Sequence, residues 1–296
     1  MNLYTKNIGK TFSGVNVLRN VNFSLEPGEV HALVGENGAG KSTFVKVLSG
    51  VYTPTIGNIY LDDQKVRINT PIAAQKNGIS LIHQEPQSFS HLSVAENIFM
   101  GHMDGSNFSR VKWKDINKSS EKILSSIGLK IDPKNIMEGL SIADQQMIEI
   151  AGALSKNSKI LIMDEPTSPL TPNEVGKLFK IVKQLKDQGM AIIFISHRLE
   201  EIRAIADRVT IFRDGDLIIV WPWDFQDSKA DVKHRYTKTQ ALYLPLSALF
   251  SSDLWRKSEF SPDRDCLASL SHASLMALSA ILDRSPASLD SPRGIA

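Results

Sequence analysis

The feature that most constrains the fold of this chain is residues 35–43, which read GENGAGKST and match the pattern G-x-x-x-x-G-K-[ST]. The apolar run Val30–Val34 predicts a short buried strand before it, and Ser42–Leu48 predicts the start of a helix. Glycines let backbone N–H groups approach an anion, and a helix N-terminus adds partial positive charge. The chain is therefore predicted to bind a nucleoside triphosphate. The candidate binding residues are Gly35, Asn37, Gly38, Gly40, Lys41, Ser42 and Thr43.

Two of these side chains and two later acids have predicted chemical roles. Lys41 is expected to reach the β- and γ-phosphates, and the Ser42 hydroxyl is expected to help hold Mg²⁺. The apolar run Ile160–Met163 predicts a strand that ends at Asp164, and ligands bind at the carboxyl ends of strands in open parallel sheets. Asp164 is therefore a candidate Mg²⁺ ligand, through water, and Glu165 a candidate general base. An exposed acidic turn is the alternative for this pair.

The composition excludes several other classes of protein. The 296 residues carry a net charge of +2, which is too small to indicate nucleic acid as the main partner. The single cysteine, Cys266, excludes an internal disulfide framework and a cysteine-rich zinc site. The first residues lack the apolar core of a signal peptide, and no apolar run is long enough for a spanning helix. The chain is expected to be cytosolic.

Strands and helices alternate along most of the chain, which favours an α/β domain with a buried and largely parallel sheet. The first thirty residues are predicted to be β-rich, and residues from about 93 to 155 mostly helical. Further expected elements are strands Leu3–Ile8, Val21–Leu25, Ile59–Leu61, Ile79–Gln84, Lys159–Asp164, Ala191–Ser196 and Arg208–Phe212, and helices Asn173–Gln188 and Leu199–Ile205.

Four further sites complete an ordered set. They are Phe12 in KTFSG, Gln84 in IHQEP, Ser141 in LSIADQQ and His197 in FISHR. Together with the phosphate loop and the Asp164–Glu165 pair, these motifs resemble the ATP-binding subunit of an ABC transporter from about Leu3 to Asp216. The resemblance implies the fold of a P-loop NTPase, namely an ABC ATPase domain with a β-rich N-terminal portion and a helical subdomain.

The resemblance also implies a role for each matching residue. Phe12 would stack on adenine, and Gln84 would contact Mg²⁺ and the attacking water. Ser141, at the N-cap of a helix, would close over the γ-phosphate held by an opposing subunit. His197 would contact the γ-phosphate. The segment Ser168–Thr171 would cross the dimer interface.

Two positions depart from the family pattern. The segment Leu140–Gln146 matches the family's signature motif, and Ala143 stands where glycine is usual in it. The methyl group of Ala143 is expected to weaken the approach to the phosphate. Pro169 stands where alanine is usual in the interface loop, and proline fixes φ and removes an N–H. Neither change removes a catalytic group, so reduced activity is expected rather than none.

Short segments such as AENIFMG at residues 95–101 and EIA at 149–151 resemble the corresponding segments of importers of ribose, xylose or rhamnose. The chain also resembles the autoinducer-2 importer, which belongs to the same class. The resemblance implies an ATP hydrolase that uses ATP and Mg²⁺ to energise a membrane importer. Its implied partners are permease subunits, a second ABC ATPase domain and, indirectly, a solute-binding protein, with no nucleic acid. The implied location is the cytoplasmic face of the membrane, as a peripheral protein.

Residues 1–219 are expected to form the ATPase domain, with the helical subdomain at about 88–155. Residues 220–296 do not resemble the linker or second ATPase domain of this class; a disordered, frame-shifted or unrelated tail is expected there. Two other functions remain open. One is a truncated ATP-binding fragment with weak or no activity, and the other is a non-transport ABC ATPase.

Overall fold

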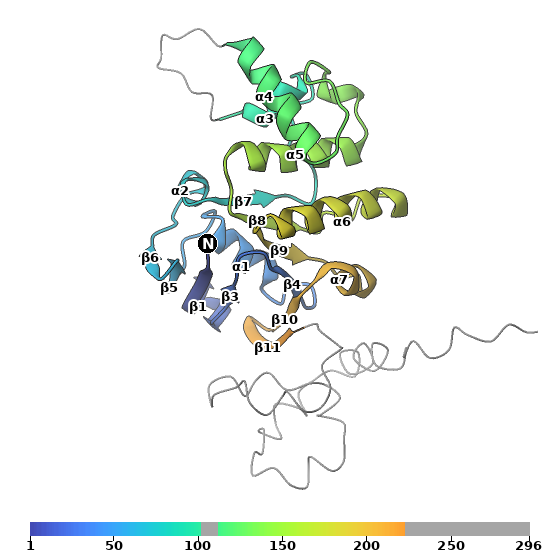
Figure 1. Ribbon diagram of the computed structural model, residues 1–296. Coiled ribbons are helices and arrows are strands. Elements are labelled where there is room, and N and C mark those ends of the chain that lie inside the picture. The colour runs from blue at the N-terminus through green and yellow to red at the C-terminus, as the bar shows by residue number, and fades with distance from the viewer. Residues whose placement is uncertain (102–111, 223–296) are drawn as a thin grey trace, which may run out of the picture. The chain divides into compact units, whose positions relative to one another are not determined.

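A computed structural model of the chain describes residues 1–101 and 112–222 (Figure 1). Strand β11 (Asp216–Pro222) continues past the boundary expected at residue 219. The rest of the expected tail lies outside the described residues. No helix in the described ranges is long and apolar enough to cross a membrane.

The larger sheet confirms the predicted α/β fold. Its order is β11-β10-β4-β9-β8-β7, in which β10 through β7 pair in parallel and β11 is antiparallel to β10. The strands predicted around residues 30, 79, 160, 191 and 208 are all present, whereas β11 was not predicted. The bounds are β4 (Val30–Val34), β7 (Ile79–Ile82), β8 (Ile160–Asp164), β9 (Ala191–Ile195) and β10 (Arg208–Arg213).

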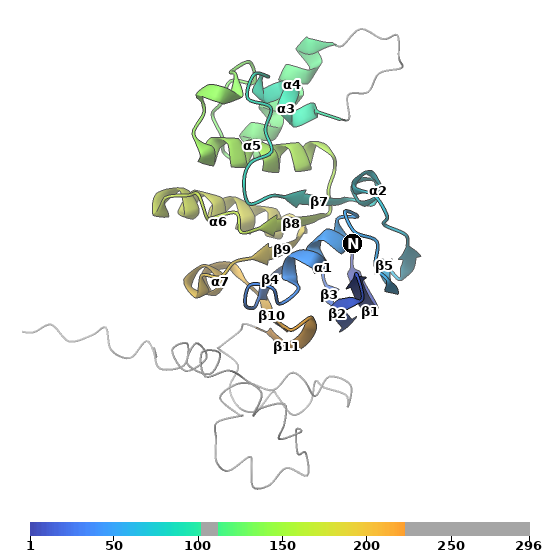
Figure 2. The same ribbon diagram turned by 180° about the vertical axis from the view of Figure 1, so that it is seen from behind.

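Alternate residues of the central strands enter two different cores. Ile160 and Ile162 of β8 pack in the core that contains helix α1 (Lys41–Leu48). Leu161 and Met163 pack in the core that contains helix α6 (Pro172–Asp187). Side chains alternate along a strand, so a continuous apolar run has both faces of the sheet covered (Figures 1 and 2). Helix α7 (Leu199–Ile205) follows β9.

A second, antiparallel sheet forms the N-terminal portion, in the order β2-β1-β5-β6 with β3 on β1. The strand predicted at Val21–Leu25 is interrupted: Val21 ends β2, where it pairs with Ile8, and Ser24–Leu25 pair with β1 as β3. The apolar alternation across the break reflects burial in one core. A hairpin at Ser13 and Gly14, both with positive φ, was missed because this pair is a weaker turn signal than Asn-Gly. The bounds are β1 (Leu3–Phe12), β2 (Val15–Val21), β5 (Ile56–Leu61) and β6 (Gln64–Val66).

The segment between β7 and β8 is mostly helical in its described part, as predicted. Its helices gather beside the β7 edge of the larger sheet (Figures 1 and 2). Ser93 opens one of them with a capping box to Glu96, which satisfies two backbone N–H groups. The helices are α3 (Val94–Phe99), α4 (Trp113–Ser126), the 3₁₀ turn η1 (Met137–Gly139) and α5 (Ile142–Ser155); a short α2 (Pro71–Lys76) precedes β7.

Phe44 of α1 gives a test of how this fold is held together. Its ring is fully buried and lies 5.3 Å from the ring centroid of Phe23 and 5.5 Å from that of Phe212. Phe44→Ala is expected to lower the free energy of unfolding by about 3–5 kcal/mol, because it removes apolar contacts and leaves a cavity. Urea unfolding measures this loss. Ile72→Ala, at an exposed site on α2, should change stability by less than about 0.5 kcal/mol.

Candidate functional site

The phosphate loop joins the end of β4 to the start of α1, and two of its glycines are required by close neighbours. A Cβ atom on Gly35 would lie 2.3 Å from the Phe212 carbonyl oxygen of β10. Gly40, the N-cap of α1, has φ +107°, and a Cβ atom there would lie 2.9 Å from Leu18. Side chains at these positions would push the loop away from β10 and β2. The loop is therefore shaped by the two strands that flank it.

Lys41 points back into this loop. Its side chain donates hydrogen bonds to the carbonyl oxygens of Gly35 at 2.7 Å and Glu36 at 3.0 Å, and the residue is 8% exposed. Burial lowers the pKa of Lys41, while the nearby charges of Glu165 and Asp164 oppose that change. The loop thus contains a buried cation near two carboxylates. Ser42 and Asn37 are exposed, and Thr43 is partly buried.

Glu165 and His197 come together because β8 and β9 are adjacent parallel strands. Asp164, the last residue of β8, pairs with Ile195, the last residue of β9. The backbone N–H of Glu165 also donates to the Ile195 carbonyl at 3.1 Å. His197 Nδ1 then lies 3.4 Å from Glu165 Oε1, although the histidine side chain is 63% exposed. Glu165 adopts a left-handed backbone conformation, with φ +48°, which is uncommon for a residue other than glycine.

Asp164 carries the electrostatic signature expected of a cation site. Burial raises the pKa of Asp164, and repulsion from Glu165 raises it further. His83, Lys46 and Lys41 act in the opposite direction. Two neighbouring carboxylates that are partly removed from water gain most from a bound cation.

Gln84 follows β7 and is exposed. It lines a hollow of about 380 Å³ together with Ile142 and Gln145 of α5 and with Ser168 and Pro169. Within residues 1–101 and 112–222, no hydrogen bond links Gln84 to Asp164 or Glu165. The structure therefore places the Gln84 loop beside the helix that begins after Ser141 and beside the Ser168–Pro169 segment.

Ser141 is the N-cap of α5, as predicted. Its hydroxyl oxygen accepts from the Asp144 N–H at 3.1 Å and donates to the Asp144 carboxylate at 2.8 Å. No hydrogen bond joins Ser141 to Lys41 in the described part of the chain. Ala143 is buried in the core shared by α5 and the sheet, so its methyl group packs inward. Ile142 beside it is exposed.

Phe12 ends β1 and is 37% exposed. The Tyr52 ring meets it edge-on at 5.0 Å, and the Lys10 ammonium lies 4.9 Å from the Phe12 ring centroid. Val15, the residue that faces Phe12 across the hairpin, is exposed as well. The hairpin thus presents a small apolar surface, and the adenine-stacking role of Phe12 stays a prediction.

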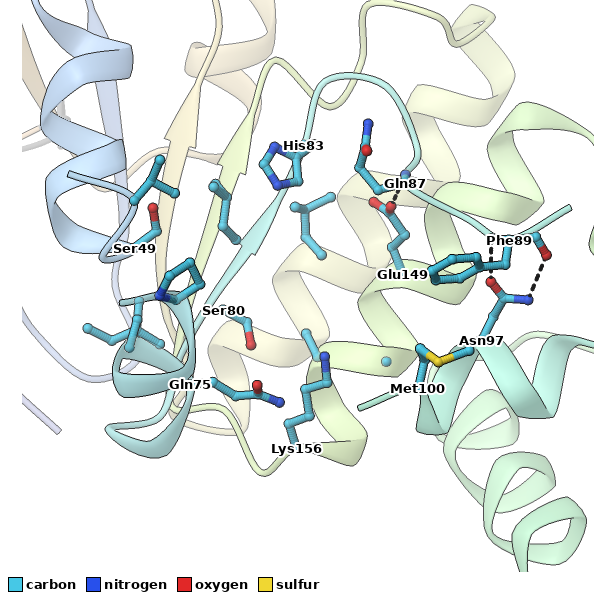
Figure 3. A pocket seen from close by; sticks show the side chains of 18 residues that line it. Ser49, Gln75, Ser80, His83, Gln87, Phe89, Asn97, Met100, Glu149 and Lys156 are labelled. Atoms are coloured by element: carbon cyan, nitrogen blue, oxygen red, sulfur yellow. Dashed lines mark hydrogen bonds between the residues drawn. The ribbon is translucent and has the colours of Figure 1, made fainter. Parts of the chain in front are cut away.

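A pocket of about 370 Å³ lies between α2, β7, α3 and α5 (Figure 3). Glu149 of α5 projects into it, and one oxygen of its carboxylate accepts from the backbone N–H of Gln87. The second oxygen is buried and has no hydrogen-bond partner in the described part of the chain. Burial raises the pKa of Glu149 to about 7, and the hydrogen bond from Gln87 and the charge of Lys156 only partly oppose it. Burial likewise lowers the pKa of Lys156.

Sequence reasoning did not single out His83, Tyr52 or the pocket carboxylate Glu149. His83 precedes Gln84 and its charge acts to lower the pKa of Asp164. A single histidine after a strand does not by itself indicate a functional residue in the sequence. Tyr52 reaches Phe12 only because the chain returns to β1 after α1. Contacts between residues this far apart in the sequence can be identified only once the fold is known.

Glu149 predicts a pH dependence of stability. The pKa of Glu149 is higher in the folded than in the unfolded state. Its favourable contribution to the free energy of unfolding is therefore complete below about pH 4.5 and is lost as the pH rises through about 7. Glu149→Gln, which is always neutral, should therefore gain about 2–3 kcal/mol relative to the wild type between pH 5 and pH 8. Chemical unfolding at both pH values measures the difference.

The matched control is Glu121→Gln, which removes an exposed carboxylate from α4. Its stability relative to the wild type should stay nearly constant over the same range. Equal responses of the two variants would contradict the assignment of the effect to Glu149.

Comparison with known proteins identifies the family of this chain. The ABC transporter family model matches residues 18–168. The ribose import ATP-binding protein RbsA 2 of Streptomyces avermitilis is 49% identical over 222 residues, which is 75% of this chain and 44% of that protein. A putative ribose/galactose/methyl galactoside import ATP-binding protein of Agrobacterium fabrum is 48% identical over 216 residues, or 73% of this chain and 43% of that protein. The chain thus spans less than half the length of these relatives.

Solved structures give the same result for the fold. An ATP-binding cassette of an ABC transporter in its ADP conformation has a TM-score of 0.68 and 27% identity, and the match covers 75% of this chain and 91% of that one. A nucleotide-free cassette has a TM-score of 0.68 and 26% identity, with 75% and 92% covered. The matched family model, the phosphate loop and the Glu165–His197 pair lead to one conclusion: this chain belongs to the ABC transporter family.

Proposed function

We propose that this chain binds ATP with Mg²⁺ and hydrolyses it, as the ATPase domain that energises an importer of simple sugars such as ribose. The contact between Glu165 and His197, at the carboxyl edge of the parallel sheet and near Lys41, carries this proposal. The similarity to ribose import proteins supports the substrate class. Autoinducer-2 is the alternative transported substrate.

The phosphate loop fits a nucleotide. The Lys41 ammonium is bonded to the loop's own carbonyl groups, so phosphate oxygens can take their place as stronger, charged acceptors. Backbone N–H groups of residues 35–43 and the N-terminus of α1 favour the same anion. The apolar surface at Phe12 and Val15 offers a platform for a base.

The acidic groups fit Mg²⁺, which is usually bound by one or two carboxylates together with phosphate oxygens. Asp164 and Ser42 are the residues that would hold it, with Gln84 approaching from its loop. Bound Mg²⁺ would supply charge neutralisation at the phosphates. The raised pKa of Asp164, caused by burial and by Glu165, agrees with a place for a cation there.

Glu165 is the group that would accept a proton from the attacking water, and His197 would hold the γ-phosphate side of the site. The 3.4 Å contact between them lets each orient the other. The exposed histidine can then contact a nucleotide without a rearrangement of β9.

A second ATPase domain is needed to complete the site. Ser141 and the N-terminus of α5 make no hydrogen bond with the phosphate loop within the described ranges, so a signature helix from a second copy or from another domain would face it. The exposed Ile142 and the hollow shared with Ser168 and Pro169 support an interface on this side.

The permease is proposed to dock at the Glu149 pocket (Figure 3). Gln87 joins the Gln84 loop to Glu149, and Glu149 lies on the helix that begins after Ser141. A partner that docks in this pocket would therefore displace both the Gln84 loop and the helix that carries the signature motif. A solute-binding protein would act only through the permease, and this docking would keep the chain on the cytoplasmic face of the membrane.

The proposed ATPase domain is residues 1–219, with the helical subdomain at about 88–155, and the atypical tail is residues 220–296, except that strand β11 extends the ATPase domain to Pro222. Because the chain spans less than half of its curated relatives, a fragment that binds ATP but needs another half for turnover is the second candidate.

ATP turnover by the purified chain, beside Glu165→Gln, tests the proposal. Loss of the general base should lower turnover by at least about 100-fold, while ATP binding persists. Size-exclusion chromatography with ATP and Mg²⁺ should show the variant trapped as a dimer.

Lys41→Ala is the control, because it removes the cation of the loop and should weaken nucleotide binding itself. Equal turnover by the wild type and Glu165→Gln would contradict the catalytic assignment. ATP binding without turnover or dimerisation in either protein would favour the fragment.

A further inference from the structure

Glu201 is a buried carboxylate with an unusual set of partners. It lies on α7 and is 6% exposed. Its Oε2 atom accepts hydrogen bonds from the Thr167 hydroxyl and the Ser196 hydroxyl, each at 2.7 Å. Its Oε1 atom accepts from the Arg198 guanidinium at 3.2 Å. Buried carboxylates are rare unless they are paired in this way.

The two hydroxyl donors belong to the two catalytic loops. Thr167 follows Glu165 by two residues, and Ser196 immediately precedes His197. Both hydroxyl-bearing residues are buried. One oxygen atom of Glu201 therefore links, from inside the protein, the same two segments whose side chains meet at the surface as the partly buried Glu165 and the exposed His197.

A carboxylate is well suited to this position because it only accepts hydrogen bonds, so both hydroxyl groups must donate to it. The Ser196 oxygen then accepts from the backbone N–H of Arg198 at 3.0 Å. The result is a directed chain from the Arg198 backbone through Ser196 to Glu201. Glutamine could accept from the hydroxyls but would lose the charge that pairs with the Arg198 guanidinium.

We infer that Glu201 is a positioning residue that holds the Glu165 loop and the His197 loop in the register of their contact. This inference rests on the proposed ATPase function for its catalytic meaning, but its geometry does not. Without Glu201, the Thr167 and Ser196 hydroxyls remain buried without their acceptor, and the two loops lose their common anchor.

The kinetic test compares Glu201→Ala with Glu201→Gln and with Glu200→Gln, an exposed neighbour on the same helix. Glu201→Ala should lower kcat by about 10- to 100-fold, because a small misplacement of catalytic groups is costly. Binding of a fluorescent ATP analogue should change by less than about twofold, since the phosphate loop is untouched. Glu201→Gln should recover part of the lost kcat, and Glu200→Gln should match the wild type.

A second readout needs no turnover. Imidazole NMR signals of His197, assigned by their loss in His197→Gln, should shift when Glu165→Gln is introduced into the wild type. In the Glu201→Ala background, Glu165→Gln should leave these signals nearly unchanged, because the loops no longer hold the contact. A shift of the same size in both backgrounds would overturn the inference.

The two readouts separate the two hypotheses. A wild type without ATPase activity would defeat the proposed function, while the NMR comparison would still decide the role of Glu201. If Glu201→Ala does not fold, Ser196→Ala removes one donor and takes its place in the same comparison. Unchanged kcat in a folded Glu201→Ala protein with an active wild type would also overturn the inference.

Discussion

The parallel pairing of β8 with β9 is the constraint on which the site depends. It aligns the ends of the two strands, so that Asp164 lies opposite Ile195 and the residues that follow emerge side by side. Both strands are buried on both faces, between the core of α1 and the core of α6. A shift of one residue in this pairing would exchange the two faces and separate Glu165 from His197. The strand register that packs the sheet therefore also sets the geometry of the site.

The sequence predicted the parts of the site that are encoded locally. The phosphate loop around Lys41 and the acids after β8 are each written in a short motif, and the parallel sheet follows from continuous apolar runs. Glu201, His83 and Tyr52 could not be found in this way, because each depends on a residue that is distant in sequence, namely Thr167, Asp164 and Phe12 respectively. The hairpin at Ser13 and Gly14 was missed for a different reason, since its turn residues are not distinctive.

The helical segment between β7 and β8 is not an independent unit. Residues of α5, such as Met147 and Ile150, share one core with Leu161 and Met163 of β8. A rigid contact of this kind transmits displacement better than a flexible hinge does, because a packed core resists deformation. The helix that begins after Ser141 is thus mechanically linked to the strand that ends at Asp164.

The loops that carry Gln84, Glu165 and His197 follow strands that are hydrogen-bonded to different numbers of neighbours. β8 and β9 each pair on both sides, whereas β7 pairs only with β8 among the described strands. Backbone amides at a sheet edge open at lower free energy than those in the interior, and exchange their hydrogens faster. The loop that carries Gln84 therefore leaves the most weakly held of the three strands. The sheet provides a fixed frame for Glu165 and His197 and a more compliant support for the Gln84 loop, whose Gln87 donates a hydrogen bond to Glu149.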